Sequence, residues 1–446
     1  MKWKKDYNKI PHSGDKEETM KMFTDMTGIV GALKIVMVSV YTLFAIVTQA
    51  QEVEEPKVEI DGFVRNYTGI LLGQGNDFSI VQNTLDLTLK HQKEKVGFVA
   101  NPFMYQYPYK DNYFGVRELY MDFYSDKTDI RIGKQQIIWG QADGVFITDI
   151  VSPKNLTEFL LWDFNEIRMG VTAVKANFYP HPDHDFEAVW IPAFTPTLAP
   201  EAGTIWYPEI LFPAPPIFDM SNAKVPVTLK NSELFGRYTL SKSAIDLQII
   251  GGYTWDDDPS IHAEKQLDSV TMQLTGIILS PEHHRLALTG ASFSTEIQGF
   301  VIRGEGAWYK NKYFQTTAPD AVGALTKKDY VNYVIGIDKT IGTWRLSGQF
   351  IQKIILDYND MMRNDEVDNL ATLMVNKTLF REQVRLEFFS YLGLNNEDAL
   401  IRFRGYYFPY DGVSLELGTN IFVGEKGIFG QYNDNDMVYT RIKYSF

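Results

Sequence analysis

A long insert at residues 140–165 carries charged side chains whose spacing is suited to filtering ions or solutes in a pore. Rings of charged side chains and the width of the passage set selectivity in pores. We expect the insert and its flank to supply these constriction residues: Asp143, Asp149, Lys154, Asp163, Glu166 and Arg168. The alternative is an ordinary external loop with solvated charges. The apolar run at residues 159–162 favours burial within the protein.

A second charged set lies in segments whose side chains alternate between apolar and polar. Alternation places these residues on the polar face, where we expect them to line a lumen: Arg131, Arg303, Glu305, Arg385, Glu387, Arg402, Arg404, Glu416, Arg441 and Lys443. The basic residues of the last strands, facing an acidic insert, would set up a transverse field that steers charged solutes. The alternative is that these charges pair and stiffen the wall.

Bond-breaking and metal chemistry have little support in the sequence. Residues 181–185 (His-Pro-Asp-His-Asp) have metal-binding residue types, but they fall in a short link and give a weak zinc signal. The acidic run at residues 256–258 is explained by an external loop. There is no Gly-x-Ser-x-Gly motif, phosphate-binding loop or haem attachment motif, and no cysteine. We therefore predict no enzyme activity, no cofactor and no metal site.

The elements that must position these charges are β-strands with a period of two. At residues 84–90, leucines alternate with threonine, aspartate and lysine, and residues 399–405 and 412–423 alternate in the same way. Such a strand has one apolar and one wet face. In an outer-membrane barrel the apolar face points to lipid and the polar face to the lumen.

The spacing of the links supports a barrel. Short polar links alternate with long ones, as expected for short periplasmic turns and long external loops. The sequence predicts an all-β, transmembrane antiparallel β-barrel of about 18 strands, with about 16 as the competing count. We assign the alternating segment 268–279 to an external loop because an even strand number requires it. The proline-rich residues 194–229 are predicted to be a second long inserted loop.

The two ends of the chain predict export and assembly. An apolar run at residues 35–47 and the small residues around Ala50 resemble a signal peptide within residues 1–50, cleaved near Ala50, followed by an acidic leader at 51–57 and the barrel at 58–446. A transmembrane anchor is the alternative, but Lys34 shortens the span. The last segment alternates up to Phe446, which resembles the signal read by the barrel assembly machinery of Gram-negative bacteria.

The composition agrees with a membrane barrel. The formal net charge of −13 argues against nucleic-acid binding, which needs a basic face. Aromatic residues make up 14% of the chain, which suits aromatic girdles in contact with outer-membrane lipid. A chain that has no second apolar span can cross a membrane as a closed barrel.

Several motifs resemble a Gram-negative outer-membrane family that is defined by a domain of unknown function numbered thirteen-oh-two. The resemblance lies in Arg-Ile-Gly-Lys-Gln at 131–135, Trp-Gly-x-Ala-Asp at 139–143, Ser-Pro-Lys-Asn-Leu at 152–156, Arg-Met-Gly-Val at 168–171 and Phe-Val-Ile-Arg-Gly-Glu at 300–305. Residue 152 is serine, where the family pattern more often has asparagine. The resemblance implies a porin-like barrel and no particular substrate.

These observations favour a porin-like channel for small solutes, narrowed by the insert at 140–165. The second hypothesis is a barrel that acts as a sheath or scaffold for a periplasmic redox or export partner. An outer-membrane hydrolase comes third, because it would need a serine, histidine and acid set at one rim.

Overall fold

The structure is a computed structural model and describes residues 58–73, 77–208 and 212–446. The expected signal peptide at 1–50 and leader at 51–57 lie outside the described residues. Residues 58–446 form one compact unit. No helix in the described part of the chain is long and apolar enough to cross a membrane.

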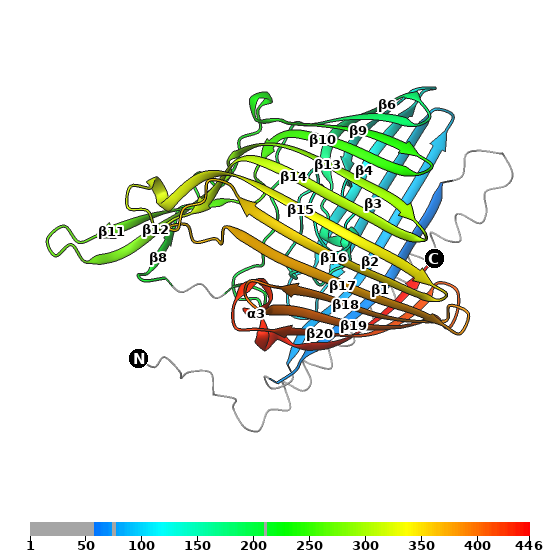
Figure 1. The fold of residues 1–446 in the computed structure, drawn as a ribbon. Coiled ribbons are helices and arrows are strands. Elements are labelled where there is room, and N and C mark those ends of the chain that lie inside the picture. The colour runs from blue at the N-terminus through cyan, green and yellow to red at the C-terminus, as the bar shows by residue number, and fades with distance from the viewer. Residues whose placement is uncertain (1–57, 74–76, 209–211) are drawn as a thin grey trace, which may run out of the picture. The chain divides into compact units, whose positions relative to one another are not determined.

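Eighteen antiparallel strands form one closed sheet, as the sequence predicted (Figure 1). Each strand pairs with the next wall strand along the chain, and β21 pairs with β1 to close the ring. The wall strands are β1 (Glu59–Leu71), β2 (Phe78–Lys93), β3 (Val96–Gln106), β4 (Tyr113–Tyr124), β5 (Thr128–Gln135), β6 (Val171–His181), β7 (His184–Ile191), β9 (Glu233–Lys242), β10 (Ile245–Trp255), β13 (Arg285–Ile297), β14 (Phe300–Gln315), β15 (Leu325–Ile341), β16 (Trp344–Ile355), β17 (Val367–Leu379), β18 (Val384–Gly393), β19 (Asp398–Tyr407), β20 (Val413–Val423) and β21 (Met437–Ser445).

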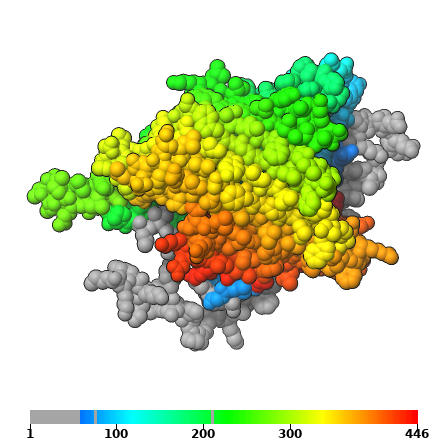
Figure 2. All heavy atoms as spheres, in the orientation of Figure 1, coloured from blue at the N-terminus to red at the C-terminus, as the bar shows by residue number. Residues whose placement is uncertain are grey.

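The links between strands are short at one end of the barrel and mostly long at the other, which confirms the predicted alternation. The predicted loop segment 268–279 is not part of the wall. It contributes to a hairpin of β11 (Ser260–Leu267) and β12 (Leu274–Glu282), and β8 (Pro216–Phe218) pairs in parallel with β12. This hairpin projects beyond the long-loop end, and Figure 2 shows it standing out from the surface.

The two faces of the wall differ in chemistry. Along β15, Ile335 and Ile337 are exposed, whereas Asp338 next to them is buried. Along β21, Ile442 and Tyr444 are exposed and Arg441 is buried. Since neighbouring side chains in a strand point to opposite faces, the outside of the barrel is apolar and the inside is polar. The short-turn end also exposes aromatic residues: Phe178, Phe186, Phe300, Trp344, Tyr407 and Phe446.

The insert begins earlier and ends later than the sequence suggested. The sequence predicts a strand that runs to the Trp-Gly break at 139–140, but β5 ends at Gln135. The Ile137 N–H donates to Ser152 Oγ (2.9 Å), so the backbone there bonds within the insert instead of the sheet. The sequence also predicts that Glu166 opens the next strand, but Glu166 lies in the helical turn α2 (Phe164–Ile167) and β6 starts at Val171.

Candidate functional site

Residues 136–170, which join β5 to β6, lie inside the ring of strands and are called the lumen segment here. Their polar contacts are with inward side chains of strands that include β1 and β14. These two strands lie nearly opposite each other in the closed ring. The lumen segment therefore crosses the interior instead of extending into solvent above it.

Glu305 of β14 binds the first half of the lumen segment. Its buried carboxylate accepts hydrogen bonds from the backbone N–H groups of Gln141, Ala142 (2.6 Å) and Thr148 (3.2 Å). The Thr148 hydroxyl also donates to it at 2.6 Å. Hydrogen bonds to an ionised carboxylate are stronger than neutral ones, so this contact fixes the path of residues 141–148.

Further wall groups hold the same half. Gln349 donates to the Asp143 carbonyl (2.6 Å) and accepts from the Asp143 N–H (3.1 Å). The Tyr391 hydroxyl donates to the Gly144 carbonyl at 2.8 Å. The Asp143 carboxylate forms an ion pair with Arg303 and lies 3.7 Å from Arg345. Asp143 thus sits against β14 and β16, away from the other acidic residues of the predicted constriction.

Arginines bind the second half. Arg402 donates to the carbonyls of Leu160 (3.2 Å) and Leu161 (3.3 Å), and Arg441 donates to Leu161 (3.0 Å) and to the Asp163 carboxylate (3.1 Å). Arg65 of β1 forms a bidentate pair with Glu166, with N–O distances of 2.8 and 2.9 Å. The Arg65 and Glu166 side chains are both buried.

Asp163 faces open space beside this arginine cluster. Its side chain is 55% exposed, and its carboxylate lies 3.1 Å from Arg441 and 3.8 Å from Arg65. Burial among the barrel residues raises the pKa of Asp163, but the guanidinium groups of Arg441 and Arg65 outweigh it and lower the pKa to about 2. Asp163 therefore carries a full negative charge at any physiological pH.

The remaining predicted constriction residues contact the lumen segment itself. Asp149 and Arg168 form an ion pair with each other at 2.5 Å. Lys154 lies over the Phe146 ring, with its Nζ 5.2 Å from the ring centroid. The structure thus brings Asp163 and Glu166 together with wall arginines, and it separates them from Asp143, Asp149 and Lys154.

An apolar cluster anchors the segment where its sequence is most hydrophobic. The Phe159 ring packs against Trp206, Phe422 and Tyr432, at centroid distances of 6.3, 6.1 and 4.9 Å. Trp206 comes from the long link between β7 and β9, and its indole N–H donates to Glu158 at 3.0 Å. The proline-rich link is therefore packed onto the lumen segment in this region.

Most predicted lining residues are paired across the inner wall. Four arginines form ion pairs: Arg131 with Asp122 (2.7 Å), Arg303 with Asp338 (2.8 Å), Arg404 with Glu387, and Arg441 with Glu416 (3.7 Å). Two further cations lie over aromatic rings: Arg385 over Tyr406 (4.2 Å) and Lys443 over Phe63 (4.4 Å). This pairing is what the alternative interpretation expected. Asp163, with its exposed carboxylate, is the predicted constriction residue most open to the lumen.

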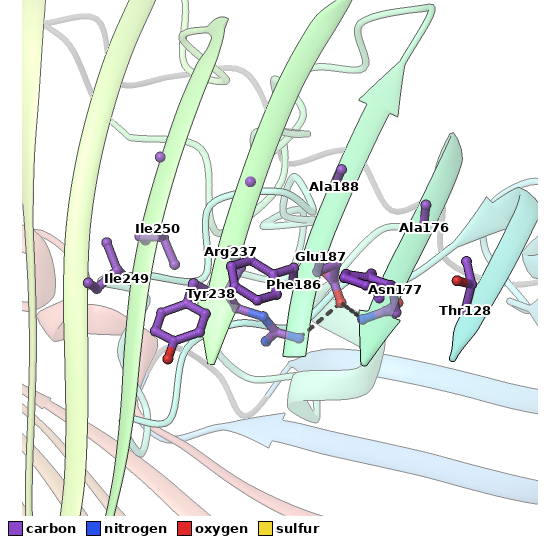
Figure 3. A pocket seen from close by; sticks show the side chains of 13 residues that line it. Thr128, Ala176, Asn177, Phe186, Glu187, Ala188, Arg237, Tyr238, Ile249 and Ile250 are labelled. Carbon is purple, nitrogen blue, oxygen red and sulfur yellow. Dashed lines mark hydrogen bonds and ion pairs between the residues drawn. The ribbon is translucent and has the colours of Figure 1, made fainter. Parts of the chain in front are cut away.

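The sequence analysis did not identify several side chains that make these contacts. Arg65, Gln349 and Tyr391 hold the lumen segment, and Arg237 binds Glu187 at 2.9 Å (Figure 3). Alternation alone could have placed Arg65 on the inner face, between Val64 and Asn66. The pocket in Figure 3 is lined by Phe186 and Ile249, which are exposed on the outer face of the wall, and it also borders the Arg237–Glu187 pair.

Comparisons with known proteins agree with the fold. Residues 104–378 match the family described as "Protein of unknown function (DUF1302)". No curated protein matches the chain. Acinetobacter baumannii OccAB1 is similar in structure, with a TM-score of 0.51, 11% identity and coverage of 89% of this chain and 99% of that one. Pseudomonas aeruginosa OccK2 (OpdF), solved in complex with glucuronate, also has a TM-score of 0.51, with 9% identity and coverage of 87% and 97%.

Proposed function

The chain belongs to the DUF1302 family of proteins of unknown function, and we propose that it is a channel for small solutes in the outer membrane of a Gram-negative bacterium. The observation that carries the proposal is the closed ring of strands with an apolar outer face and a charged interior. A closed barrel leaves no unpaired strand edge in lipid, and its polar interior can hold water.

The lumen segment is proposed to narrow this channel. Its first half is bound to β14, β16 and β18, and its second half to β19, β21 and β1. Asp163 would then present its negative charge to a passing solute, beside the buried guanidinium groups of Arg441 and Arg65. Arg402, Arg404 and Lys443 add positive charge on neighbouring strands, which favours electrostatic steering of solutes at this side.

The orientation follows the length of the links. The long loops are proposed to face the exterior and the short turns the periplasm. The amphipathic strand β21, with exposed Ile442 and Tyr444, is proposed to be the strand recognised by the barrel assembly machinery. Export through a signal peptide cleaved near Ala50 belongs to the same proposal.

A sheath for a periplasmic partner protein is the second candidate, and an occupied interior counts against it. The lumen segment fills space that a partner chain would need, and it is held there by buried Glu305 and Arg65. No enzymatic step is part of the proposal.

The test uses a single cysteine, since the native chain has none. Residues 51–446 carrying Asp163→Cys are refolded in detergent and inserted into a planar bilayer. A positively charged thiol reagent added to the bath should reduce the stepwise single-channel current. Ile337→Cys, on the exposed outer face, is the matched control and should not respond. Absence of stepwise current would reject the channel, and an equal response of both variants would reject the position of Asp163 in its passage.

A further inference from the structure

Three metal-binding side chains meet outside the barrel wall, at its long-loop end. His262 lies on β11, Glu282 ends β12, and His284 follows in the link to β13. The Nε2 atoms of His262 and His284 are 3.1 Å apart, and Glu282 Oε2 lies 3.4 Å from His262 Nε2. One ligand atom from each of the three residues falls within 4.8 Å of the other two.

Sheet geometry explains why they meet. β11 and β12 are antiparallel, with Ser260 opposite Glu282 and His262 opposite Ser280. His262 and Glu282 are therefore diagonal neighbours on one face of the hairpin. In an extended chain the side chain two residues further on returns to the same face, which places His284 beside them. His283 points elsewhere, because it is buried and its Nδ1 lies 2.7 Å from the Asp256 carbonyl.

We propose that His262, Glu282 and His284 bind one zinc ion, with water as the fourth ligand. Zinc takes imidazole nitrogen and carboxylate oxygen at about 2.0–2.2 Å in a tetrahedral site. Two ligand atoms on such a tetrahedron lie about 3.3–3.4 Å apart. Two of the three observed separations, at 3.1 and 3.4 Å, are close to this spacing.

The surroundings hold both imidazoles in place. The His284 ring stacks on Tyr313 of β14, with centroids 3.9 Å apart and an interplanar angle of 28°. Gly323 lies against His262, where an added Cβ would come within 2.5 Å of its Nδ1.

The ion would join the two strands of the hairpin at its base. β11 supplies one ligand, and the end of β12 with the following link supplies the other two (Figure 1). Zinc binding should therefore stabilise the hairpin relative to the barrel rim. The proposal goes beyond the channel function and does not depend on it.

Isothermal titration calorimetry with zinc chloride tests this site in the refolded chain, prepared without a polyhistidine tag. We expect one zinc ion per chain, with affinity reduced about 100-fold by His262→Ala and at least about tenfold by Glu282→Gln. Calcium and magnesium should not compete, because they prefer oxygen ligands.

His184→Ala is the matched control, since His181 and His184 form another histidine pair, with ring centroids 5.8 Å apart, at the opposite end of the barrel. This variant should bind zinc like the native chain. The proposal is overturned if the native chain takes up no zinc, or if His262→Ala and His184→Ala bind it equally well. Circular dichroism and heat-dependent gel migration verify that each variant has folded.

Discussion

The two halves of the lumen segment are held by different wall groups. In the first half, the Glu305 carboxylate accepts from backbone N–H groups of Gln141, Ala142 and Thr148, and wall side chains such as Gln349 and Tyr391 donate to backbone carbonyls. In the second half, the guanidinium groups of Arg402 and Arg441 donate to backbone carbonyls of Leu160 and Leu161. Each wall thus satisfies the backbone groups that an irregular chain leaves unpaired.

This difference shows how a long loop without regular structure can have one defined path inside a barrel. A buried backbone group needs a partner, and here the partners come from the wall instead of from a helix or sheet. The wall groups that hold the first half lie on β14, β16 and β18, and those that hold the second half lie on β19, β21 and β1. Replacing one group on each wall tests whether the two halves behave independently.

Arg65→Gln should have the largest effect. It leaves the buried Glu166 carboxylate without its bidentate partner, and breaking a buried ion pair from one side costs about 4 kcal/mol. Urea unfolding in detergent micelles should show a free energy of unfolding lowered by about this amount. Lys90→Gln is the control, because its ion pair with Asp61 is exposed to solvent, and a loss of at most about 1 kcal/mol is expected. Equal losses in the two variants would contradict the assigned role of Arg65.

Glu305→Gln should have an intermediate effect and act on the first half alone. The amide keeps one acceptor oxygen but loses the charge, so we expect a loss of about 2 kcal/mol. Limited trypsin digestion should cut after Lys154 faster than in the native chain, because the first half is released more often.

Ser292→Ala is the neighbouring control, since Ser292 is paired with Glu305 in the sheet and hydrogen-bonds Gln248. Its digestion should match that of the native chain. If Glu305→Gln also leaves cleavage after Lys154 unchanged, this carboxylate does not hold the segment.

Lowering the pH should weaken the binding of the second half of the lumen segment, and this effect should be the smallest of the three. The pKa of Asp163 in the folded chain is about 2, below its ordinary value of 3.8. Its contribution to stability is therefore complete above about pH 4 and is lost as the pH falls through about 2. The fluorescence of tryptophan, including neighbouring Trp162, should report a change over this range that is smaller in Asp163→Asn. An identical acid response of the two proteins would exclude Asp163 as its source.

The wall of the barrel was predictable from the sequence and the path of the loop was not. Alternation in segments such as 412–423 reports directly on the two faces of a strand, so strand number and closure followed from local pattern. The apolar run at residues 159–162 also pointed correctly to burial. The partners of the lumen segment come from strands more than a hundred residues away, as for Glu305 and Arg402, and local pattern carries no information about such contacts.

Two further features were not predicted correctly, because both depend on contacts between segments that are distant in the sequence. The apolar residues 137–139 suggest that the preceding strand continues, yet Ile137 and Trp139 are buried within the interior packing of the lumen segment. His262 and the pair Glu282 and His284 were not connected, because their contact depends on the register of a hairpin that had been assigned to a loop. A Glu-x-His sequence that begins at the end of one strand, together with a histidine on the neighbouring strand, is the signal that could have found them.

Single-channel conductance with and without the lumen segment tests the central claim most directly. Because Gln135 pairs with Val171, residues 137–169 can be replaced by a short Asn-Gly turn without altering the pairing of β5 and β6. Heat-dependent gel migration verifies that both barrels are folded. We expect a steady current from the native chain and a clearly larger one from the shortened chain. Equal currents would contradict the narrowing role of the segment, and no current from either folded barrel would contradict the channel itself.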